Sequence, residues 1–507
     1  MDVTPQNQNL YTHYRSGFAH QLDAVLLETA AGEVYRYRDA ERISAQMANC
    51  LCDLGLKPGD RVSAQIEKSP QGLFLYLACL RAGLIFHPLN TAYQLEELRY
   101  FLGNAEPSLV VCDEQNQQAL RLLCEDLGIQ HVFTLNSNGE GSLSDAARPC
   151  SGEFETLTQQ SDDVAALLYS SGTTGKPKGI MLTHGNLASN ARTLVDYWGF
   201  NSSDRLLHAL PIFHVHGLFV ALGCVFCSGA SMVWLSKFDA AQALAYLPKS
   251  TVMMGVPTYY TRLLAQAGFN RDLCANMRLF ISGSAPLLEE TFNTFERVSG
   301  HAILERYGMS ETSMNTSNPL EGKRKAGTVG FPLPGIELRI VGADGREVAQ
   351  GSVGDLQVRG RNVFQAYWRM PEKTAEDFTQ DGFFNTGDKG QVDSEGYVSI
   401  VGRAKDMIIC GGLNVYPKEI EQVVDELDGV VESAVIGLPH PDFGESVAAV
   451  LVAEPGVDIT QADVLSALKD RLANFKRPKS VFIVEQLPRN AMGKVQKNVL
   501  RAQFSDV

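Results

Sequence analysis

Hydroxyls, glycines and lysines gather in one stretch of the chain, Tyr169-Ser170-Ser171-Gly172-Thr173-Thr174-Gly175-Lys176-Pro177-Lys178-Gly179. Small residues let backbone N–H groups approach phosphate oxygens, hydroxyls add donors, and lysines supply positive charge. The stretch is not a Walker A loop, because two residues rather than four separate Gly172 from Gly175 and Pro177 occupies the Ser/Thr place. It predicts a phosphate-binding loop, and the alternative is a flexible surface turn.

Two arginines, Arg262 and Arg278, could bind an anionic group of a substrate other than its phosphates. Arg278 directly precedes the apolar run Leu279–Ile281, and a charge there is costly unless it is paired. A guanidinium group recognises a carboxylate through two parallel hydrogen bonds. Either arginine could therefore bind a carboxylate of a substrate. A structural ion pair is the alternative for each.

Short apolar runs alternate with helix-like stretches and must position these residues. Strands are expected at 165–168, 252–256 and 279–281, and a helix at 41–54. This alternation predicts an α/β fold, with a large N-terminal domain of mixed sheets and packed helices. We assign residues 1–403 to that domain, which contains the proposed phosphate loop and both arginines.

After about residue 400 the chain changes to a compact unit of its own. Strands are expected at 433–436 and 447–452, and a helix with Val464, Leu465, Leu468 and Leu472 on one face. Residues 404–507 are therefore predicted to form a small mobile α+β C-terminal domain.

The composition bounds the function. The 507 residues carry a net charge of -14, which leaves no basic footprint for nucleic acid or an anionic membrane. Leu206 to Leu235 contains no Asp, Glu, Lys or Arg, but histidines, Pro211 and glycines interrupt it, so a buried core is expected rather than a membrane span. The polar N-terminus and ten cysteines without zinc spacing indicate a cytoplasmic protein with reduced thiols.

The chain resembles the adenylate-forming superfamily of acyl-CoA synthetases, non-ribosomal adenylation domains and firefly-type luciferases. The resemblance rests on the loop above and on motifs that follow in the family's order over nearly the whole chain. These are Ser282-Gly283-Ser284-Ala285-Pro286, Glu305-Arg306-Tyr307-Gly308-Met309-Ser310-Glu311-Thr312, Thr386-Gly387-Asp388, Gly402-Arg403-Ala404-Lys405-Asp406, Asn414-Val415-Tyr416-Pro417-Lys418-Glu419 and Pro488-Arg489-Asn490-Ala491-Met492-Gly493-Lys494.

The resemblance implies ATP and Mg²⁺ as ligands and a role for each motif. Glu311 would hold Mg²⁺, whose preference for hard oxygen ligands suits a carboxylate, and Ser310 would meet the α-phosphate. Asp388 and Arg403 would clamp the ribose hydroxyls. The phosphate loop would contribute Ser170, Ser171, Gly172, Thr173, Thr174 and Lys176, and the adenine pocket Ser284, Ala285, Glu305, Arg306 and Tyr307.

The same resemblance implies a two-step reaction with coenzyme A as the second substrate. Lys494 would bridge the carboxylate and phosphate during adenylation. Lys405 would be the hinge about which the C-terminal domain rotates. Gly411 and Gly412 would then lie along the pantetheine chain, which the small residues allow to pass closely.

Within the superfamily, the segments around Arg262, Arg278 and His214 resemble malonyl-CoA synthetases of fatty acid metabolism. This implies malonate as the acid, with Gly283, Met309 and His214 at the acyl site beside the two arginines. The alternatives are ligation of another short acid such as methylmalonate, an adenylating enzyme that does not use CoA, and a nucleotide-binding regulator without turnover.

Overall fold

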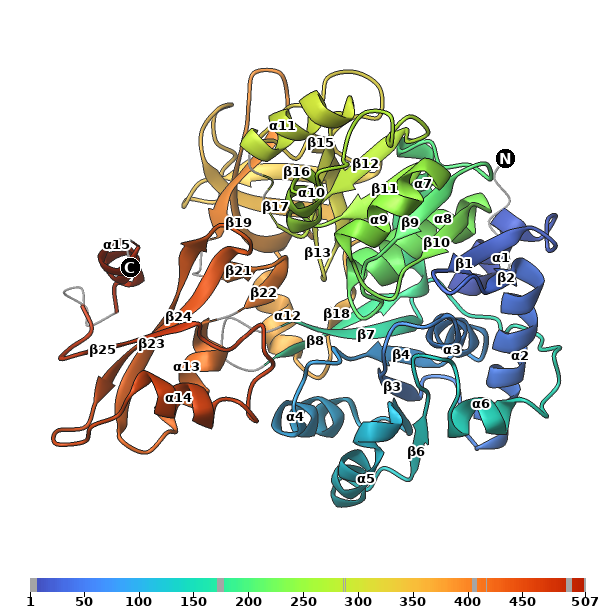
Figure 1. Ribbon diagram of the computed structural model, residues 1–507, viewed down its shortest axis with the longest axis horizontal. Helices are drawn as coiled ribbons and strands as arrows, with labels where there is room; N and C mark the ends of the chain where they lie inside the picture. Colours follow the sequence, from blue (N-terminus) through green and yellow to red (C-terminus); the bar gives the residue numbers. More distant parts are fainter. Residues whose placement is uncertain are drawn as a thin grey trace. The chain divides into compact units, whose positions relative to one another are not determined.

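The computed structural model describes residues 7–170, 177–285, 287, 289–403, 408–415, 417–488 and 495–505. The chain divides into two compact units, and the first contains most of the residues before 402 (Figure 1). The second unit combines Gly402–Val507 with two earlier segments, Ala92–Gly103 and Tyr169–Lys178. The sequence assigned those two segments to the N-terminal domain, so the observed units are more interleaved along the chain than the predicted domains.

The larger sheet of the first unit has nine strands, and its central strands run parallel. Antiparallel strands flank them: β14 and β15 on one side and β2 on the other. Across the sheet the order is β15 (Phe331–Pro332), β14 (Ser313–Ser317), β13 (Leu304–Met309), β12 (Leu279–Ser282), β11 (Val252–Gly255), β9 (Arg205–His208), β10 (Ser231–Trp234), β1 (Val25–Thr29) and β2 (Val34–Arg36).

A second sheet of seven strands also has a parallel centre, from β3 to β7. Its order is β18 (Ala366–Tyr367), β8 (Lys178–Thr183), β7 (Val164–Ser170), β4 (Ile85–Pro88), β3 (Arg61–Gln65), β5 (Leu109–Cys112) and β6 (His131–Thr134). A smaller sheet consists of β16 (Ile336–Val341), β17 (Gly354–Gly360), β19 (Phe384–Val392) and β20 (Val398–Arg403).

Helices alternate with most of the strands of the two large sheets, as is typical of an α/β fold. They are α1 (Leu10–Phe18), α2 (Tyr37–Asp53), α3 (Pro70–Arg81), α4 (Leu95–Ala105), α5 (Gln117–Asp126), α6 (Ser142–Ala147), α7 (His184–Tyr197), α8 (Leu222–Ser228), α9 (Ala240–Tyr246), α10 (Pro257–Leu264), α11 (Glu289–Ser299) and α12 (Pro371–Asp377). The short turns are η1 (Glu114–Asn116), the π-helical η2 (His216–Ala221) and η3 (Leu247–Lys249). The predicted α/β class is confirmed.

Helix α3 shows how the local sequence specifies an element. The Ser69 hydroxyl caps its start by accepting a hydrogen bond from the Gly72 amide at 3.0 Å, and Pro70 occupies the first turn, where no amide donor is needed. Every residue of the helix except Gln71 is buried, and most of the buried side chains are apolar. The helix therefore forms part of the core of the first unit.

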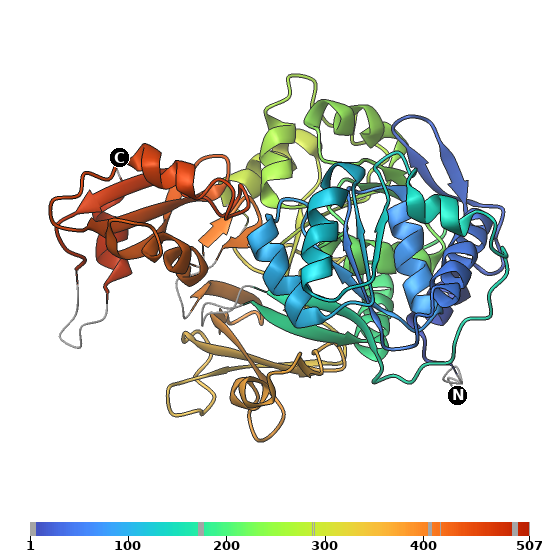
Figure 2. The same ribbon diagram turned by 90° about the horizontal axis from the view of Figure 1, so that it is seen from below.

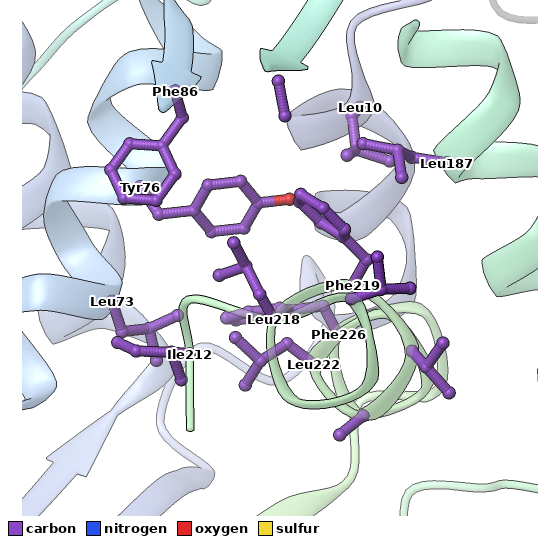
Figure 3. Close-up of a cluster of buried hydrophobic side chains, with 14 of the residues drawn as sticks. Leu10, Leu73, Tyr76, Phe86, Leu187, Ile212, Leu218, Phe219, Leu222 and Phe226 are labelled. Atoms are coloured by element: carbon purple, nitrogen blue, oxygen red, sulfur yellow. The ribbon is translucent and has the colours of Figure 1, made fainter. Parts of the chain in front are cut away.

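The charge-free stretch 206–235 is also core, as predicted. It forms β9, η2, α8 and β10, nearly all of it buried. Figure 3 shows Phe219 of η2 beside Tyr76 of α3, which in turn contacts Phe86 of β4, with ring centroids 6.0 and 5.4 Å apart. Within the described residues no helix is long and apolar enough to cross a membrane.

The second unit is built on a five-stranded sheet (orange to red in Figure 2). Helix α13 packs on β23, and the predicted strands lie within β23 and β24. The predicted helix is α14, which ends at Ala467, although Leu468 and Leu472 beyond it are also buried. The elements are β22 (Leu413–Val415), β21 (Ile408–Cys410), β24 (Gly444–Ala453), β23 (Val430–His440), β25 (Ser480–Val484), α13 (Pro417–Asp425), α14 (Gln461–Ala467) and α15 (Lys497–Phe504).

A buried lysine joins three parts of the second unit. Lys476 Nζ lies 2.8 Å from Glu97 Oε1 on α4 and 2.6 Å from Glu419 Oε1 on α13. It also lies 4.6 Å from the ring centroid of Tyr93. Because all three charged side chains are largely removed from water, their mutual pairing is needed to offset the cost of burial.

All ten cysteines lie in the described part of the chain, and none forms a disulfide. Seven of them are buried, which agrees with the expectation of reduced structural thiols. No group of three or more His, Cys, Asp or Glu among the described residues could hold a metal ion without other ligands.

Candidate active site

The carboxyl ends of neighbouring parallel strands bring the predicted site residues to one edge of the nine-stranded sheet. Gly255 at the end of β11 pairs with Ser282 at the end of β12, and Ser282 pairs with Glu305 of β13. Open α/β sheets bind ligands beyond the carboxyl ends of their strands. The loop after β12 and the outer part of β13 hold Gly283, Ser284, Ala285, Arg306, Tyr307 and Met309. This edge is the candidate active site.

Arg306 is buried at this edge, and two nitrogens of its guanidinium group have no hydrogen-bond partner among the described residues. The residue is 3% exposed, and neither Nε nor Nη2 has an acceptor among the described residues. Burial lowers the pKa of Arg306 to about 10, so the group remains charged at neutral pH. An ideal Cβ on Gly283 would lie 2.4 Å from the Arg306 Cζ, so the absence of a side chain at Gly283 makes room for the guanidinium. The sequence placed Arg306 in the adenine pocket and did not anticipate an unpaired charge.

The neighbouring acid does not neutralise Arg306. Burial raises the pKa of Glu305 to about 8, which leaves this carboxyl mostly protonated at neutral pH. Its Oε1 accepts a hydrogen bond from the Leu287 amide at 3.0 Å, and Oε2 has no partner among the described residues. The positive charge on Arg306 can therefore be balanced by an anionic ligand.

Two histidines lie within the electrostatic reach of Arg306. Burial, with a further contribution from the Arg306 charge, lowers the pKa of His214 to about 4 and that of His216 well below its usual value. Both imidazoles are therefore neutral and can donate a hydrogen bond to an anion. The Ser284 hydroxyl lies 3.3 Å from His216 Nδ1, and His216 Nε2 is buried without a partner in the described structure. His214 was predicted here; His216 was missed, although its spacing from His214 was visible.

Ser284 adopts an unusual backbone conformation, with φ of +71°. Residues other than glycine rarely adopt this left-handed backbone conformation, which costs about 1–3 kcal/mol of conformational free energy. Strain of this kind gathers at functional sites, where the surroundings enforce it. The conformation aims the Ser284 hydroxyl at His216, which places the loop after β12 against the segment that carries both histidines.

Tyr307 and Asp388 are connected by a short hydrogen bond in which the Tyr307 hydroxyl donates to Asp388 Oδ2. Asp388 lies on β19 and is 2% exposed, and its own amide donates to the Thr386 hydroxyl. The structure thus brings together the predicted adenine and ribose residues of this unit. Arg403 ends β20, but its side chain lies outside the described part of the structure.

Glu311 lies in the turn between β13 and β14, after Ser310. Its side chain is 5% exposed, and the Tyr367 hydroxyl of β18 donates to Oε1 at 3.4 Å. Mg²⁺ commonly binds one or two carboxylates and completes its coordination with phosphate oxygens and water. A single buried carboxylate at this position fits that pattern, so Glu311 would hold the ion together with nucleotide phosphates.

Arg278 has a structural role, which corrects the prediction that it binds the acid. Its Nε and Nη2 donate to Asp204 Oδ1 and Oδ2, each at 2.7 Å. The remaining bonds go to the carbonyls of Trp198 and Gly199 at 3.0 and 3.1 Å. Arg278 also precedes β12, whereas the candidate site follows that strand, so the two lie at opposite ends of it. The ion pair that was the alternative is the observed arrangement.

Several other predictions are not resolved by the side-chain geometry. Arg262 is exposed on α10, and its role at the acyl site stays a prediction. Gly411 and Gly412 have φ of +57° and +81°, which favours glycine, and the Gly411 amide donates to the Phe443 carbonyl at 2.9 Å. The loop residues 171–176, Lys405 and Lys494 lie outside the described residues; β7 ends at Ser170 and β8 begins at Lys178, on either side of that loop.

Comparison with known proteins shows the family. The model of the AMP-binding enzyme family matches residues 17–368, and that of the AMP-binding enzyme C-terminal domain matches residues 419–494. The chain belongs to the AMP-binding enzyme family. This family member is 36% identical to a malonate–CoA ligase of Arabidopsis thaliana, over 89% of this chain and 79% of that protein.

Solved structures extend the comparison. The AMP-binding enzyme described here is 51% identical to ATP-bound MatB from Rhodopseudomonas palustris, with a TM-score of 0.78 and 99% of each chain covered. A malonyl-CoA ligase in a ternary product complex with methylmalonyl-CoA and AMP is 34% identical, with a TM-score of 0.80, over 92% of this chain and 97% of that one.

Proposed function

We propose that this AMP-binding enzyme is an ATP-dependent malonate–CoA ligase. It joins malonate to AMP with release of pyrophosphate, and then transfers the malonyl group to coenzyme A with release of AMP. Family membership and the names of the relatives support the reaction type. The observation that supports malonate is Arg306, a buried cation in the candidate site that has no charged carboxylate partner among the described residues.

The charge of the substrate explains why this observation selects a dicarboxylate. Every acid substrate must place one carboxylate against the α-phosphate of ATP, where it reacts. Malonate carries a second carboxylate, which would pair with Arg306 and accept hydrogen bonds from the neutral His214 and His216. A monocarboxylate would leave the guanidinium buried without a counter-charge, at a cost of several kcal/mol.

The remaining predicted site residues would bind the nucleotide, the metal ion and CoA in the two half-reactions. Tyr307 and Asp388 would hold the adenosine, and Glu311 would hold Mg²⁺, which supplies positive charge to the nucleotide phosphates. Lys494 would approach the reacting carboxylate only during adenylation, and Gly411 and Gly412 would border the pantetheine chain of CoA. Catalysis would then consist mainly of positioning and electrostatic stabilisation.

The test is a panel of acids assayed for pyrophosphate release with wild type, Arg306→Met and Arg278→Met. We expect Arg306→Met to reduce kcat/KM for malonate by about a hundredfold, which corresponds to about 3 kcal/mol, and to affect acetate and butyrate far less. Arg278→Met is the matched control, because its arginine is already paired with Asp204. An equal loss for all acids in Arg306→Met would place this arginine at the nucleotide instead and remove the support for malonate.

Two further assays separate the alternatives. Formation of AMP that depends on added CoA distinguishes a CoA ligase from an adenylating enzyme that does not use CoA. Methylmalonate tests whether a branched dicarboxylate is accepted at the same site, and sulfoacetate tests whether another distal anion can replace the carboxylate. A cytoplasmic location, inferred from the sequence, stays a prediction that cell fractionation can check.

A further inference from the structure

Another buried basic side chain without a carboxylate partner in the described structure, Lys68, lies in the first unit. It follows strand β3 and precedes helix α3, and it is 6% exposed. Its Nζ lies 2.8 Å from His208 Nδ1 and 2.8 Å from the His208 carbonyl, and 4.3 Å from the centroid of the Trp234 ring. No carboxylate of the described structure pairs with it, and burial lowers its pKa well below the usual value. A lysine buried without an acidic partner is costly, so its position requires an explanation.

The contacts on the two sides of the His208 ring determine its tautomer. A carbonyl oxygen only accepts hydrogen bonds, so Nε2, which faces the Gly217 carbonyl, must carry the proton, and in the neutral imidazole Nδ1 is then the acceptor for Lys68. His208 Nε2 lies 3.0 Å from the Gly217 carbonyl and therefore donates to it. The opposite tautomer would leave the Gly217 carbonyl without this donor.

Gly217 connects this contact with the acyl site. It belongs to the π-helical turn η2, directly after His214 and His216. An ideal Cβ on Gly217 would lie 2.0 Å from the Pro211 carbonyl oxygen, so the turn folds tightly back on the chain that precedes it. His216 is in turn held by Ser284 across the site. A shift of the Gly217 carbonyl would therefore move the two imidazoles relative to Arg306.

We infer that Lys68 is a positioning residue for the acyl site, which acts through His208 and Gly217 to hold His214 and His216 beside Arg306. The contact spans the two large sheets, because Lys68 follows β3 of the seven-stranded sheet while His208 ends β9 of the nine-stranded sheet. This inference rests on the proposed function, since it assigns the histidines to recognition of the acid.

The first test replaces Lys68 by Met, which keeps the length of the side chain and removes its donors. We expect the KM for malonate to rise by about tenfold, with the KM for ATP unchanged within about twofold, because uniform binding of the acid is weakened. Lys237→Met is the matched control, because Lys237 lines the same cavity of about 170 Å³ as Lys68 but is exposed to solvent. Equal effects of the two substitutions, or equal changes in both KM values, would overturn the inference.

Chemical rescue provides a readout that a merely structural lysine would not show. In Lys68→Ala, added propylamine should enter the cavity and restore part of the affinity for malonate, because its nitrogen can donate to His208. Tetramethylammonium has a similar charge but no N–H donor, and should restore nothing. Rescue by both cations, or by neither, would contradict a role for the hydrogen bond to His208.

A substitution at His208 keeps the inference testable if the Lys68 variants do not fold. Gln offers both an amide acceptor and an amide donor, whereas Leu offers neither. We expect His208→Gln to keep the KM for malonate within about threefold and His208→Leu to raise it by about tenfold. Equal KM values in the two variants would overturn the inference. A wild type that adenylates other acids but not malonate would instead contradict the proposed function.

Discussion

Arg278, which directly precedes β12, forms a bidentate ion pair with Asp204, which directly precedes β9. Both N–O distances are 2.7 Å. The Asp204 side chain is 2% exposed, so removal of the arginine would leave a carboxylate buried without its partner. We expect Arg278→Ala to lower the free energy of unfolding by about 3 kcal/mol. Urea denaturation measures this loss, and the surviving folded enzyme should lose activity on malonate and acetate by the same factor. A loss restricted to malonate would restore Arg278 to the acyl site.

Gly283 provides a second test of the Arg306 position. A methyl group at residue 283 would lie 2.4 Å from both Cζ and Nη1 of Arg306, so the guanidinium must shift. We expect Gly283→Ala to raise the KM for malonate by about tenfold and to leave the KM for acetate within about threefold. Steady-state kinetics with both acids check this expectation. A larger effect on acetate would show that the glycine serves the reacting carboxylate rather than the distal one.

Glu305 predicts a pH dependence of stability. Its pKa of about 8 in the folded protein exceeds the ordinary value of 4.5, so between these pH values the unfolded chain has released a proton that the folded protein retains. Wild-type stability therefore falls as the pH rises through this window. Glu305→Gln removes this proton release. Its stability relative to wild type should increase by up to about 1.4 kcal/mol per pH unit between about pH 5 and 8. A flat difference in denaturation midpoints across this range would contradict the raised pKa.

Lys494 is predicted to act in one half-reaction. Its charge is needed while the carboxylate approaches ATP, and not when a thiol attacks the finished adenylate. We expect Lys494→Ala to abolish pyrophosphate release almost completely, while thioester formation from supplied malonyl-adenylate stays within about threefold of wild type. Comparable losses in the two half-reactions would remove this assignment.

Lys405 is predicted to have the opposite profile. Proline at this position would fix φ near about −65° and restrict rotation of the backbone. If the residue is the hinge between the two half-reactions, Lys405→Pro should slow thioester formation by about tenfold or more and leave adenylation nearly unchanged. Single-turnover measurements of each step distinguish the two. Normal thioester formation would exclude a hinge at this residue.

Much of the fold could be predicted from the sequence because the signals were local. The strands at β7, β11 and β12, and the helix α2, follow from apolar runs of the right length and periodicity. The burial of 206–235 follows from the absence of charge. The contribution of Ala92–Gly103 to the second unit has no local signal, because it depends on contacts with residues that lie hundreds of positions later in the chain.

The two arginines show where sequence reasoning about the site reaches its limit. Arg278 directly precedes strand β12 and Arg306 lies within strand β13, and each has apolar residues close by in the sequence, so the local pattern does not separate their roles. Their roles differ because Asp204, which is 74 residues from Arg278, supplies one of them with a partner, while the acid beside the other is protonated. Lys68 and His208 were missed because their contact joins segments of two different sheets. The spacing of His216 from His214 was visible in the sequence, but its contact with Ser284 was not. Motif order identified the family, but the charge balance required the three-dimensional structure.

The contact between Lys476 and Glu97 also constrains how the chain matures during synthesis. The two residues are 379 positions apart, and translation proceeds at about 5–20 residues per second, so Glu97 leaves the ribosome roughly 20–80 s before its partner. Throughout that interval the segment Ala92–Gly103 has been made but cannot complete its compact unit. A chain that terminates before Lys476 would keep this carboxylate permanently unmatched. Burial of helix α4, near the beginning of the protein, thus depends on an intact C-terminal region.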